Sequence, residues 1–522
     1  MAAPTYATDL QTYNDCTSLT GLTEPAGMLG LDGVGNVDAD LAIYGTVCIT
    51  ESMRKAALGA IVFTGTQPTW TAGSTCYFAW FKWFAPNSLA NKSSGGIRIL
   101  VGNTNANYRG WYLDGADTYA YGGWKNYVVD PTQTTLATQT QGSPSTTYNT
   151  VGIGVNCPTS SPAKGNSYTL DIIRYGRGEV RFTNGDLANG YATFDGMAIV
   201  NDNATTGRWG LFQDQGGSYL WKGLMSLGLS GTAVDMRDSN VVVNIDNTEY
   251  VATNFNRIEV NNASSNIEWN SVLISSLGTR AKGEFEMIAN AAVTQSACTF
   301  TDMSTFVYQS NATCNSGTTW RRCGQLTQSG STFTDCLIDK STAPVSVLSD
   351  NPSIITNTEF ISSGSNHAVQ VVQSGSYSWT NNIVSGYETA NGTTGNEVIY
   401  NNTNGQVTIN KSGGTGTVSY RNGGTSTTTI NATVSVTLTG LKDNTEVRVL
   451  AFGTNTELAG IENATAGVSG SREFTFSLSA ATSTTVKIHS LLYEHISLDY
   501  VVPSSPTDLP VQQRFDRNYL NP

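Results

Sequence analysis

Three acidic residues in the middle of the chain have the types and spacing that glycan hydrolysis uses. They are Asp302, Asp335 and Glu359. Polysaccharide-cleaving β-helices present two or three carboxylates on adjacent turns, where one acts as an acid and another as a base or nucleophile. Asp335 and Glu359 adjoin the expected inward positions Cys336 and Thr358, so strand alternation predicts that both point outward on adjacent turns. Acidic residues are common on such surfaces, and we favour a structural role over polysaccharide depolymerisation.

An aromatic cluster in the first third of the chain is the candidate glycan-binding platform. Its members Trp111, Tyr112, Tyr121 and Trp124 lie near turns such as Gly122-Gly123. Sugar-binding proteins often place aromatic rings at such turns. The alternative is a sandwich core with a subunit contact, because aromatic residues dominate both kinds of surface. We favour this alternative.

The histidines and cysteines do not form a metal-binding or nucleophilic motif. His367, His489 and His495 are scattered along the chain. The eight cysteines include no C-x-x-C pair and have no histidine at ligand spacing. We therefore expect no metal and no cofactor. In the middle of the chain we expect buried free thiols, with disulfides possible only among the four N-terminal cysteines.

The candidate acids require a repeating framework to position them. Between about residues 258 and 420, short apolar segments recur among turns of Asn, Ser, Gly and Thr, and Cys298, Cys314, Cys336, Thr358 and Asn382 align at intervals of 16, 22, 22 and 24 residues. Such intervals are typical of one turn of a parallel β-helix. The pattern Phe333-x-x-Cys336-x-Ile338 recurs twice, at 355–360 and 379–384, with the alternation that strands require.

The flanking regions have different patterns, and together they predict an all-β chain. Six longer, aromatic-rich strands between 46 and 180 indicate a β-sandwich of the jelly-roll type. A new alternation after about residue 430 indicates a small C-terminal β-sandwich. The expected organisation is an N-terminal arm (1–45), a jelly-roll-like sandwich (46–180), a right-handed parallel β-helix with its N-terminal cap (181–430), a C-terminal β-sandwich (431–500) and a tail (501–522).

Charge and hydropathy exclude several function classes. The net charge of −12 and the isoelectric point near 4.8 argue against a nucleic-acid partner, because phosphate binding needs clustered Lys and Arg. The N-terminus lacks the basic start and apolar core of a secretory signal, and no run of eighteen apolar residues occurs. We expect synthesis in the cytoplasm and no membrane span.

Four short motifs resemble those of a family of uncharacterised virion structural proteins from tailed phages. They are Tyr-Gly-Gly-Trp (121–124) followed by Val-Asp-Pro (129–131), Ile-Arg-Tyr-Gly (173–176), Asp-Leu-Ala-Asn-Gly-Tyr-Ala-Thr-Phe (186–194) and Arg-Asp-Ser-Asn (237–240). The resemblance covers most of residues 45–430. It implies a particle-associated protein with a jelly roll and a β-helix, similar to head fibres, cement proteins and tailspikes, which are commonly trimers. It carries over no catalytic residue.

The expected function is that of a phage virion surface protein. It would be a homotrimeric capsid decoration, cement or head-fibre protein that contacts other virion proteins, projects outward and aids host adsorption. The alternative is a tailspike or tail fibre that binds or depolymerises host glycan. A non-viral adhesin is a third class. As a decoration protein it would need no active site, so we do not expect an enzyme.

Overall fold

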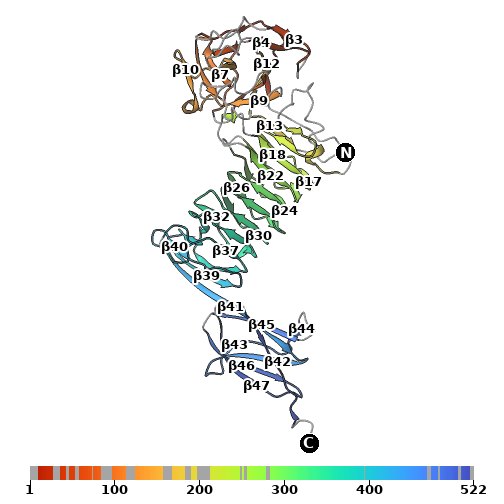
Figure 1. The fold of residues 1–522 in the computed structure, drawn as a ribbon, viewed down its shortest axis with the longest axis vertical. Helices are drawn as coiled ribbons and strands as arrows, with labels where there is room; N and C mark the ends of the chain where they lie inside the picture. Colours follow the sequence, from red (N-terminus) through yellow and green to blue (C-terminus); the bar gives the residue numbers. More distant parts are fainter. Residues whose placement is uncertain are drawn as a thin grey trace. The chain divides into compact units, whose positions relative to one another are not determined.

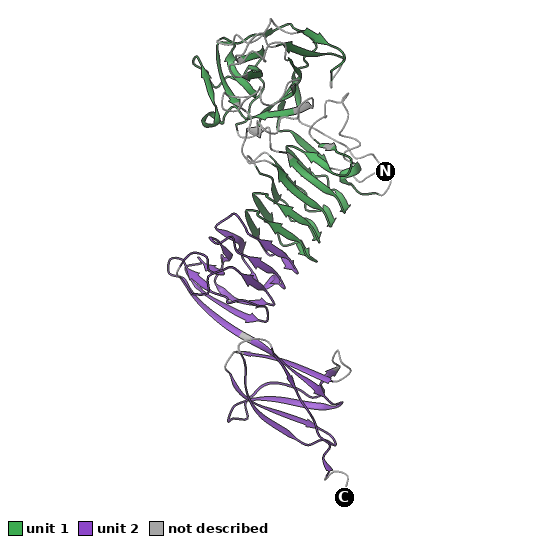
Figure 2. Ribbon diagram, viewed as in Figure 1, with its two compact units in different colours: residues 1–327 green, residues 328–522 purple. Residues whose placement is uncertain are grey.

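The computed structural model shows an all-β chain that divides into two compact units, residues 1–327 and 328–522 (Figures 1 and 2). The structure describes residues 10–26, 36–42, 46–52, 58–72, 75–83, 97–112, 124–156, 167–182, 190–196, 212–246, 250–251, 256–277, 282–392, 394–466, 472–479, 482–503 and 507–517. Within these ranges, no helix has the length and apolar character needed to cross a membrane.

The first unit begins with two sheets that are almost entirely antiparallel. The first sheet contains β1 (Gln11–Asn14), β3 (Asn36–Asp38), β4 (Cys48–Ser52), β6 (Cys76–Trp83), β9 (Trp124–Val129), β12 (Ser167–Gly176) and β19 (Tyr250–Val251). The second contains β2 (Leu22–Thr23), β5 (Leu58–Thr64), β7 (Ile97–Thr104), β8 (Asn107–Tyr112), β10 (Gln139–Gln141) and β11 (Thr150–Asn156), and the 3-10 turn η3 (Thr134–Leu136) precedes β10.

Aromatic side chains from these two sheets fill one shared core. Phe81 makes ring contacts with Tyr127 at 5.5 Å and Tyr168 at 5.3 Å between centroids, and all three are at most 1% exposed. Edge and tilted ring contacts add to the large apolar area that such side chains bury. The aromatic richness of this part of the sequence is therefore largely a packing requirement.

The rest of the first unit contains three sheets, which we call sheets I, II and III. Their strands pair in parallel except for the first two strands of sheet III, which are antiparallel, and each later turn of the chain adds one strand to each sheet. Sheet I contains β13 (Glu179–Phe182), β16 (Leu224–Leu227), β20 (Arg257–Val260), β23 (Glu284–Met287) and β26 (Thr305–Tyr308), and β29 (Gln325–Gln328) follows at the unit boundary. Sheet II contains β17 (Asp235–Ser239), β21 (Asn266–Asn270), β24 (Ala292–Ser296) and β27 (Ala312–Asn315). Sheet III contains β14 (Phe212–Asp214), β15 (Tyr219–Trp221), β18 (Val242–Asp246), β22 (Leu273–Leu277), β25 (Thr299–Thr301) and β28 (Thr319–Arg321).

A residue with positive φ ends each strand of sheet II and turns the chain toward sheet III. In the first unit these residues are Asn240, Ser271, Ala297 and Ser316, with φ of 55°, 56°, 53° and 52°. The left-handed region is sparsely allowed for residues with a Cβ, and Asn tolerates it best. Val272 and Cys298, which follow Ser271 and Ala297, are fully buried, so a sharp corner is followed by a buried side chain on these two turns.

The second unit has the same three-sheet arrangement followed by a sandwich. Its repeat contains β30 (Thr332–Thr334), β31 (Leu337–Asp339), β32 (Val345–Ser349), η6 (Pro352–Ile354), β33 (Ile355–Thr356), β34 (Glu359–Ile361), β35 (His367–Val371), β36 (Gly375–Thr380), β37 (Ile383–Ser385), β38 (Ile399–Asn401), β39 (Gln406–Ser412) and β40 (Tyr420–Asn422). The sandwich contains β41 (Thr427–Leu441), β42 (Thr445–Ala451), β43 (Glu457–Ile461), β44 (Thr465–Ala466), β45 (Arg472–Ser479), β46 (Ser483–Ser490), β47 (Ile496–Val501) and β48 (Thr507–Pro510).

One strand, β41, belongs to both parts of the second unit. Its first half pairs in parallel with β39 from Thr427 to Thr433, and its second half pairs antiparallel with β45. The change in partner falls close to residue 430, where the sequence pattern changes. Val436 and Leu438 of this second half lie in the sandwich core with Val447 of β42. The repeat and the sandwich therefore share a continuous backbone ladder.

The predicted register is confirmed in the second unit and wrong for one cysteine in the first. Phe333 pairs with Ile355, and Ile338 pairs with Phe360. Cys314, however, pairs with Gln295 on sheet II and does not align with Cys298. Thr318 takes that place, since its hydroxyl accepts a hydrogen bond from the Cys298 N–H at 3.3 Å. The error arose because the turns differ in length.

The cysteines of the repeat are buried free thiols, as predicted. Cys298, Cys314, Cys323 and Cys336 are at most 4% exposed. Burial raises the pKa of the Cys298 thiol to about 11 and that of Cys336 to about 12. Of the four N-terminal cysteines, Cys16, Cys48 and Cys76 are also free, and Cys157 lies outside the described residues.

Candidate functional site

The proposed catalytic residue Asp302 is a corner residue in the first unit. Its φ is 56°, and it directly follows β25. Both carboxylate oxygens accept hydrogen bonds from Arg322, at 3.0 and 2.8 Å. The hydrogen bonds from this guanidinium hold the pKa of Asp302 below its usual value. A carboxylate fixed in this ion pair is poorly suited to donate a proton.

Asp335 and Glu359 lie at different positions of their turns in the second unit. Asp335 is a corner residue, with φ of 54°, whereas Glu359 lies on β34 and pairs with Leu337. The residue that matches Asp335 on the next turn is Asn357, with φ of 51°. Asp335 is exposed and Glu359 is half-buried, so both acids lie on the outside of adjacent turns as expected, although Asp335 takes this position at a corner and not in a strand.

The aromatic glycan-binding candidates divide between the core and the undescribed part of the chain. Trp111 is 1% exposed, and its indole N–H donates to the Gln133 carbonyl at 2.9 Å. It is a core residue and not an exposed platform, because β8 belongs to the second sheet and the Trp111 side chain lies in the core that this sheet shares with the first. Tyr112 ends β8 and Trp124 begins β9, and Tyr121 lies outside the described residues.

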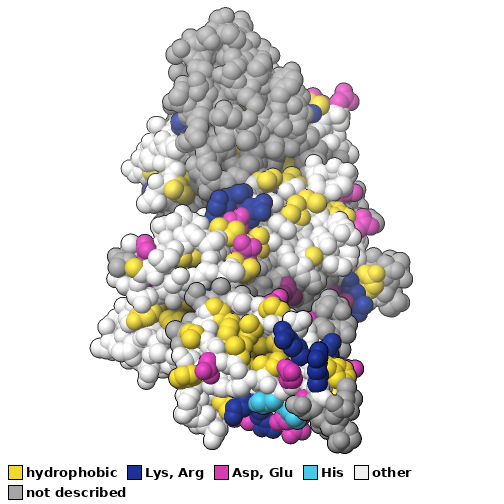
Figure 3. Space-filling model, turned by 60° about the horizontal axis from the view of Figure 1, so that its bottom comes forward, with side chains coloured by type: hydrophobic (Ala, Val, Ile, Leu, Met, Phe, Trp, Pro, Cys, Tyr) yellow, Lys and Arg dark blue, Asp and Glu magenta, His cyan; other side chains and the backbone are white. Residues whose placement is uncertain are grey.

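Two of the three histidines lie close together in the C-terminal sandwich. The rings of His489 and His495 are 6.1 Å apart, and histidine side chains lie among charged side chains of both signs on the face in Figure 3. The third, His367, is buried, with Nδ1 2.8 Å from the Glu397 carbonyl oxygen. Across the part of the chain that the structure describes, no three His, Cys, Asp or Glu side chains are arranged to hold a metal.

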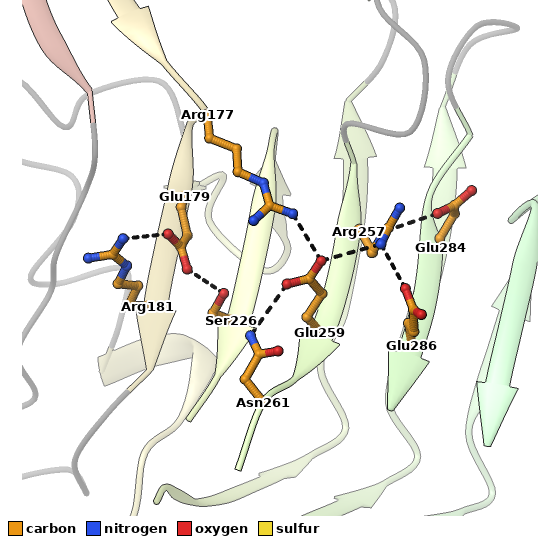
Figure 4. Close-up of polar contacts among 9 residues, drawn as sticks. All are labelled: Arg177, Glu179, Arg181, Ser226, Arg257, Glu259, Asn261, Glu284 and Glu286. Carbon is orange, nitrogen blue, oxygen red and sulfur yellow. Dashed lines mark hydrogen bonds and ion pairs between the residues drawn. The ribbon is translucent and has the colours of Figure 1, made fainter. Parts of the chain in front are cut away.

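A line of ion pairs crosses sheet I of the first unit (Figure 4). Arg257 contacts Glu284 at 3.1 Å and Glu286 at 2.7 Å, and it also reaches Glu259 at 3.4 Å. Arg177 contacts the same oxygen of Glu259, Oε1, at 3.0 Å. The buried carboxylate of Glu259 is thus neutralised by two arginines, and these ion pairs hold adjacent strands of sheet I together.

One hollow combines an aromatic ring with charged and uncharged polar side chains, as ligand sites do. It lies on sheet II of the first unit. It has a volume of about 870 Å³ and is open to solvent. Its floor is the outer face of β17, β21 and β24, and residues from 190–196 form a wall. We call it the sheet II groove. It is lined by Tyr191, Thr193, Asp195, Arg237, Asp238, Ser239, Val241, Glu268, Trp269, Asn270, Thr294 and Ser296.

Strand alternation and parallel register arrange the floor of the sheet II groove in two rows. Ser239 pairs with Asn270, which pairs with Ser296. In the other row, Arg237 pairs with Glu268, which pairs with Thr294. Inward residues such as Met236 and Ile267 fix this alternation by burial. Each row therefore places one polar side chain on every strand, about 4.8 Å from the next.

Arg237 and Tyr191 define one end of the sheet II groove. The guanidinium makes two hydrogen bonds of 3.1 Å to Asp235, lies 3.7 Å from Glu268, and sits 5.4 Å from the centre of the Tyr191 ring. The bonds to Asp235 are the main reason that the pKa of Arg237 is raised. A guanidinium over an aromatic face is attracted by the ring quadrupole. The ring is thus held beside the polar rows.

Asp238 ties the wall of the groove to its floor. It is 7% exposed, and its Oδ1 accepts a hydrogen bond from the Phe194 N–H at 3.0 Å, while its Oδ2 is buried without a hydrogen-bond partner. Burial raises the pKa of this carboxyl to about 8. Asp195 on the wall accepts a hydrogen bond from the Tyr219 hydroxyl at 3.3 Å. The pKa of Tyr219 is raised to about 12, first by burial and then by Asp195.

The sequence pattern did not indicate this groove, because the strands of its floor lie before the clearest part of the repeat. One feature of the sequence did point to this part of the chain. Parts of two motifs that carried the family resemblance, residues 190–194 and 237–240, adjoin here, and Ala192 forms a parallel bridge with Met236. The alternation Met236, Asp238 also places a carboxylate among inward residues, which is unusual enough to mark a site.

Comparisons with known proteins give structural matches of low score. No family model matches the chain, and no curated protein matches it. A mutant of the family 29 carbohydrate-binding module CBM29-2 is 11% identical, with a TM-score of 0.19, covering 32% of this chain and 92% of that one. The CBM22-1 xylan-binding domain of Paenibacillus barcinonensis Xyn10C is 14% identical, with a TM-score of 0.19, covering 34% and 96%. A β-1,2-glucanase from Parabacteroides distasonis is 9% identical, with a TM-score of 0.22, covering 31% and 24%.

Proposed function

We propose that this chain is a surface protein of a phage particle that binds glycan in the sheet II groove. The observation that carries glycan binding is the groove itself, in which an aromatic ring adjoins two rows of outward polar side chains. Saccharides offer hydroxyls that donate and accept hydrogen bonds, and Ser, Thr and Asn side chains can match both roles. Ligand sites of this kind combine a shaped surface with a few well-placed polar groups.

The proposed fold assignments suit an attached, projecting protein. We assign the three-sheet repeat to the parallel β-helices, because each turn contributes one strand to each sheet. The N-terminal pair of sheets is assigned to the jelly rolls. The low charge of the chain and its motif resemblance to virion proteins support placement on a particle, either as a capsid decoration or as a tail fibre.

The groove proposal is tested by screening the full chain on a glycan array and titrating the hits by calorimetry. Tyr191→Ala and Asn270→Ala should each weaken binding about tenfold, which corresponds to about 1.4 kcal/mol. Tyr420→Ala, which removes another half-buried tyrosine in the second unit, is the matched control and should bind normally. Absence of any hit, or hits unaffected by both groove variants, would refute glycan binding here.

Hydrolysis is the second candidate, because the groove contains carboxyl groups in different environments. Asp238 is buried with a raised pKa, whereas Glu268 is 47% exposed. Carboxyl groups with separated pKa values are typical of acid and base pairs in glycosidases. The glycans that bind should be assayed for new reducing ends. Release of reducing ends by the parent chain that is lost in Glu268→Gln would establish hydrolysis. If the glycan stays intact, the groove binds glycan without cleaving it.

Assembly as a homotrimer is part of the proposal and is measured separately. Head fibres and tailspikes, which the sequence resembles, are commonly trimers, and the chain has exposed apolar side chains such as Phe452 at 57% and Val501 at 58%. Multi-angle light scattering of the full chain should give about three times the mass of 55.6 kDa. A monomer would contradict the trimer. Cryo-electron microscopy of particles would distinguish capsid from tail placement.

A further inference from the structure

We infer that the sheet II groove selects non-anionic saccharides and rejects chains of uronic acids. This inference rests on the proposed function, which it makes more specific. It concerns the charge of the ligand, and it depends on three features of the groove: the ion pairs of its one arginine, the excess of carboxylates and the neutral character of one of its two rows.

The positively charged side chain of the groove already has a carboxylate partner within the protein. Arg237 is the one Lys or Arg among the described lining residues. Its Nε and Nη2 donate to the two carboxylate oxygens of Asp235, and Glu268 lies 3.7 Å from Nε. Arginine recognises a carboxylate best through two parallel hydrogen bonds. That arrangement is used by Asp235, so a uronate would have to displace a carboxylate of the protein.

Exposed carboxylates outnumber this cation. Asp195 on the wall is exposed, and Glu268 on the floor is 47% exposed. One oxygen of Glu268 accepts from the Asn266 amide at 2.8 Å, and the other, Oε2, lies 3.7 Å from the Arg237 Nε. Like charges within a few ångströms of each other cost free energy even near water. An anionic sugar would meet this repulsion, whereas a neutral or amine-bearing sugar would not.

The row of Ser239, Asn270 and Ser296 is uncharged along its whole length. Its members lie on adjacent strands in register, about 4.8 Å apart. Each side chain both donates and accepts hydrogen bonds, as sugar hydroxyls do. A carboxylate only accepts, so it would use half of this capacity and would lose its hydration without gaining a charged partner.

The test compares three hexasaccharides by calorimetry with the full chain: cellohexaose, the chitosan hexamer and hexagalacturonate. At least one of the first two should bind tenfold or more tightly than hexagalacturonate. Glu268→Gln should reduce this ratio of affinities at least threefold, since it removes one repelling charge. The exposed Glu462→Gln, in the second unit, is the control and should leave the ratio unchanged.

The outcomes distinguish failure of this inference from failure of the proposed function. Hexagalacturonate that binds as tightly as the other two, with loss of binding in Tyr191→Ala, would overturn charge selection and leave glycan binding in place. Selection against hexagalacturonate that Glu268→Gln does not alter would also overturn the inference. If no glycan on the array binds at all, the proposed function fails and the inference fails with it.

Discussion

Replacing Asp238 by Asn is expected to remove a large pH dependence from the stability of the chain. The pKa of this carboxyl is about 8 in the folded protein, against an ordinary value of 3.8. Between these values the folded state keeps the proton and the unfolded state does not. The group's stabilising contribution is therefore complete below pH 3.8 and is lost as pH rises to about 8. The expected slope is about 1.4 kcal/mol of unfolding free energy per pH unit.

Asparagine keeps an oxygen that accepts from the Phe194 N–H but has no proton to lose. The difference in unfolding free energy between Asp238→Asn and the parent chain should therefore grow in favour of the variant from pH 5 to pH 8. Urea unfolding followed by tryptophan fluorescence measures it. Asp214→Asn, at the exposed end of β14, is the control and should leave the slope unchanged. Parallel pH profiles for Asp238→Asn and the parent chain would show that the carboxyl is not protonated in the folded state.

Truncation of Trp320 is expected to destabilise the first unit by about 3–5 kcal/mol. Its indole is 1% exposed, packs near Phe300 and Phe306, and donates a hydrogen bond to the Tyr308 hydroxyl at 3.2 Å. Trp320→Ala removes these contacts and leaves a cavity. Because adjacent turns of the repeat depend on each other for their core, the loss is not compensated locally.

Two further variants make the Trp320 result interpretable. Trp320→Phe keeps an aromatic ring and should cost clearly less than Trp320→Ala. Thr313→Ala, on the outward face of β27, should change stability by no more than about 0.5 kcal/mol. The measurement is the same urea transition at constant pH. A loss below 1 kcal/mol for Trp320→Ala would mean that this core is more adaptable than its packing indicates.

Much of the framework was predictable because burial imposes a period on the sequence. Phe333, Ile355 and Trp379 recur with the spacing of one turn, and two ladders confirm their register. Cys314 was misplaced because a spacing alone does not tell which of the three sheets a residue joins. The corner position of Asp335 could not be predicted from strand alternation, since a residue with positive φ that follows a strand belongs to neither face of that strand.

The sequence by itself determined the class of the chain: all-β, low in charge, with a repeating parallel region and inward positions marked by apolar side chains. Only the tertiary structure decided which polar residues meet. Ser239, Asn270 and Ser296 are separated by 31 and 26 residues, yet parallel register places them in one row. Burial restricts inward positions to apolar residues at a regular spacing, whereas outward positions accept residues of many types. The position of a surface site therefore emerges only when the turns are stacked.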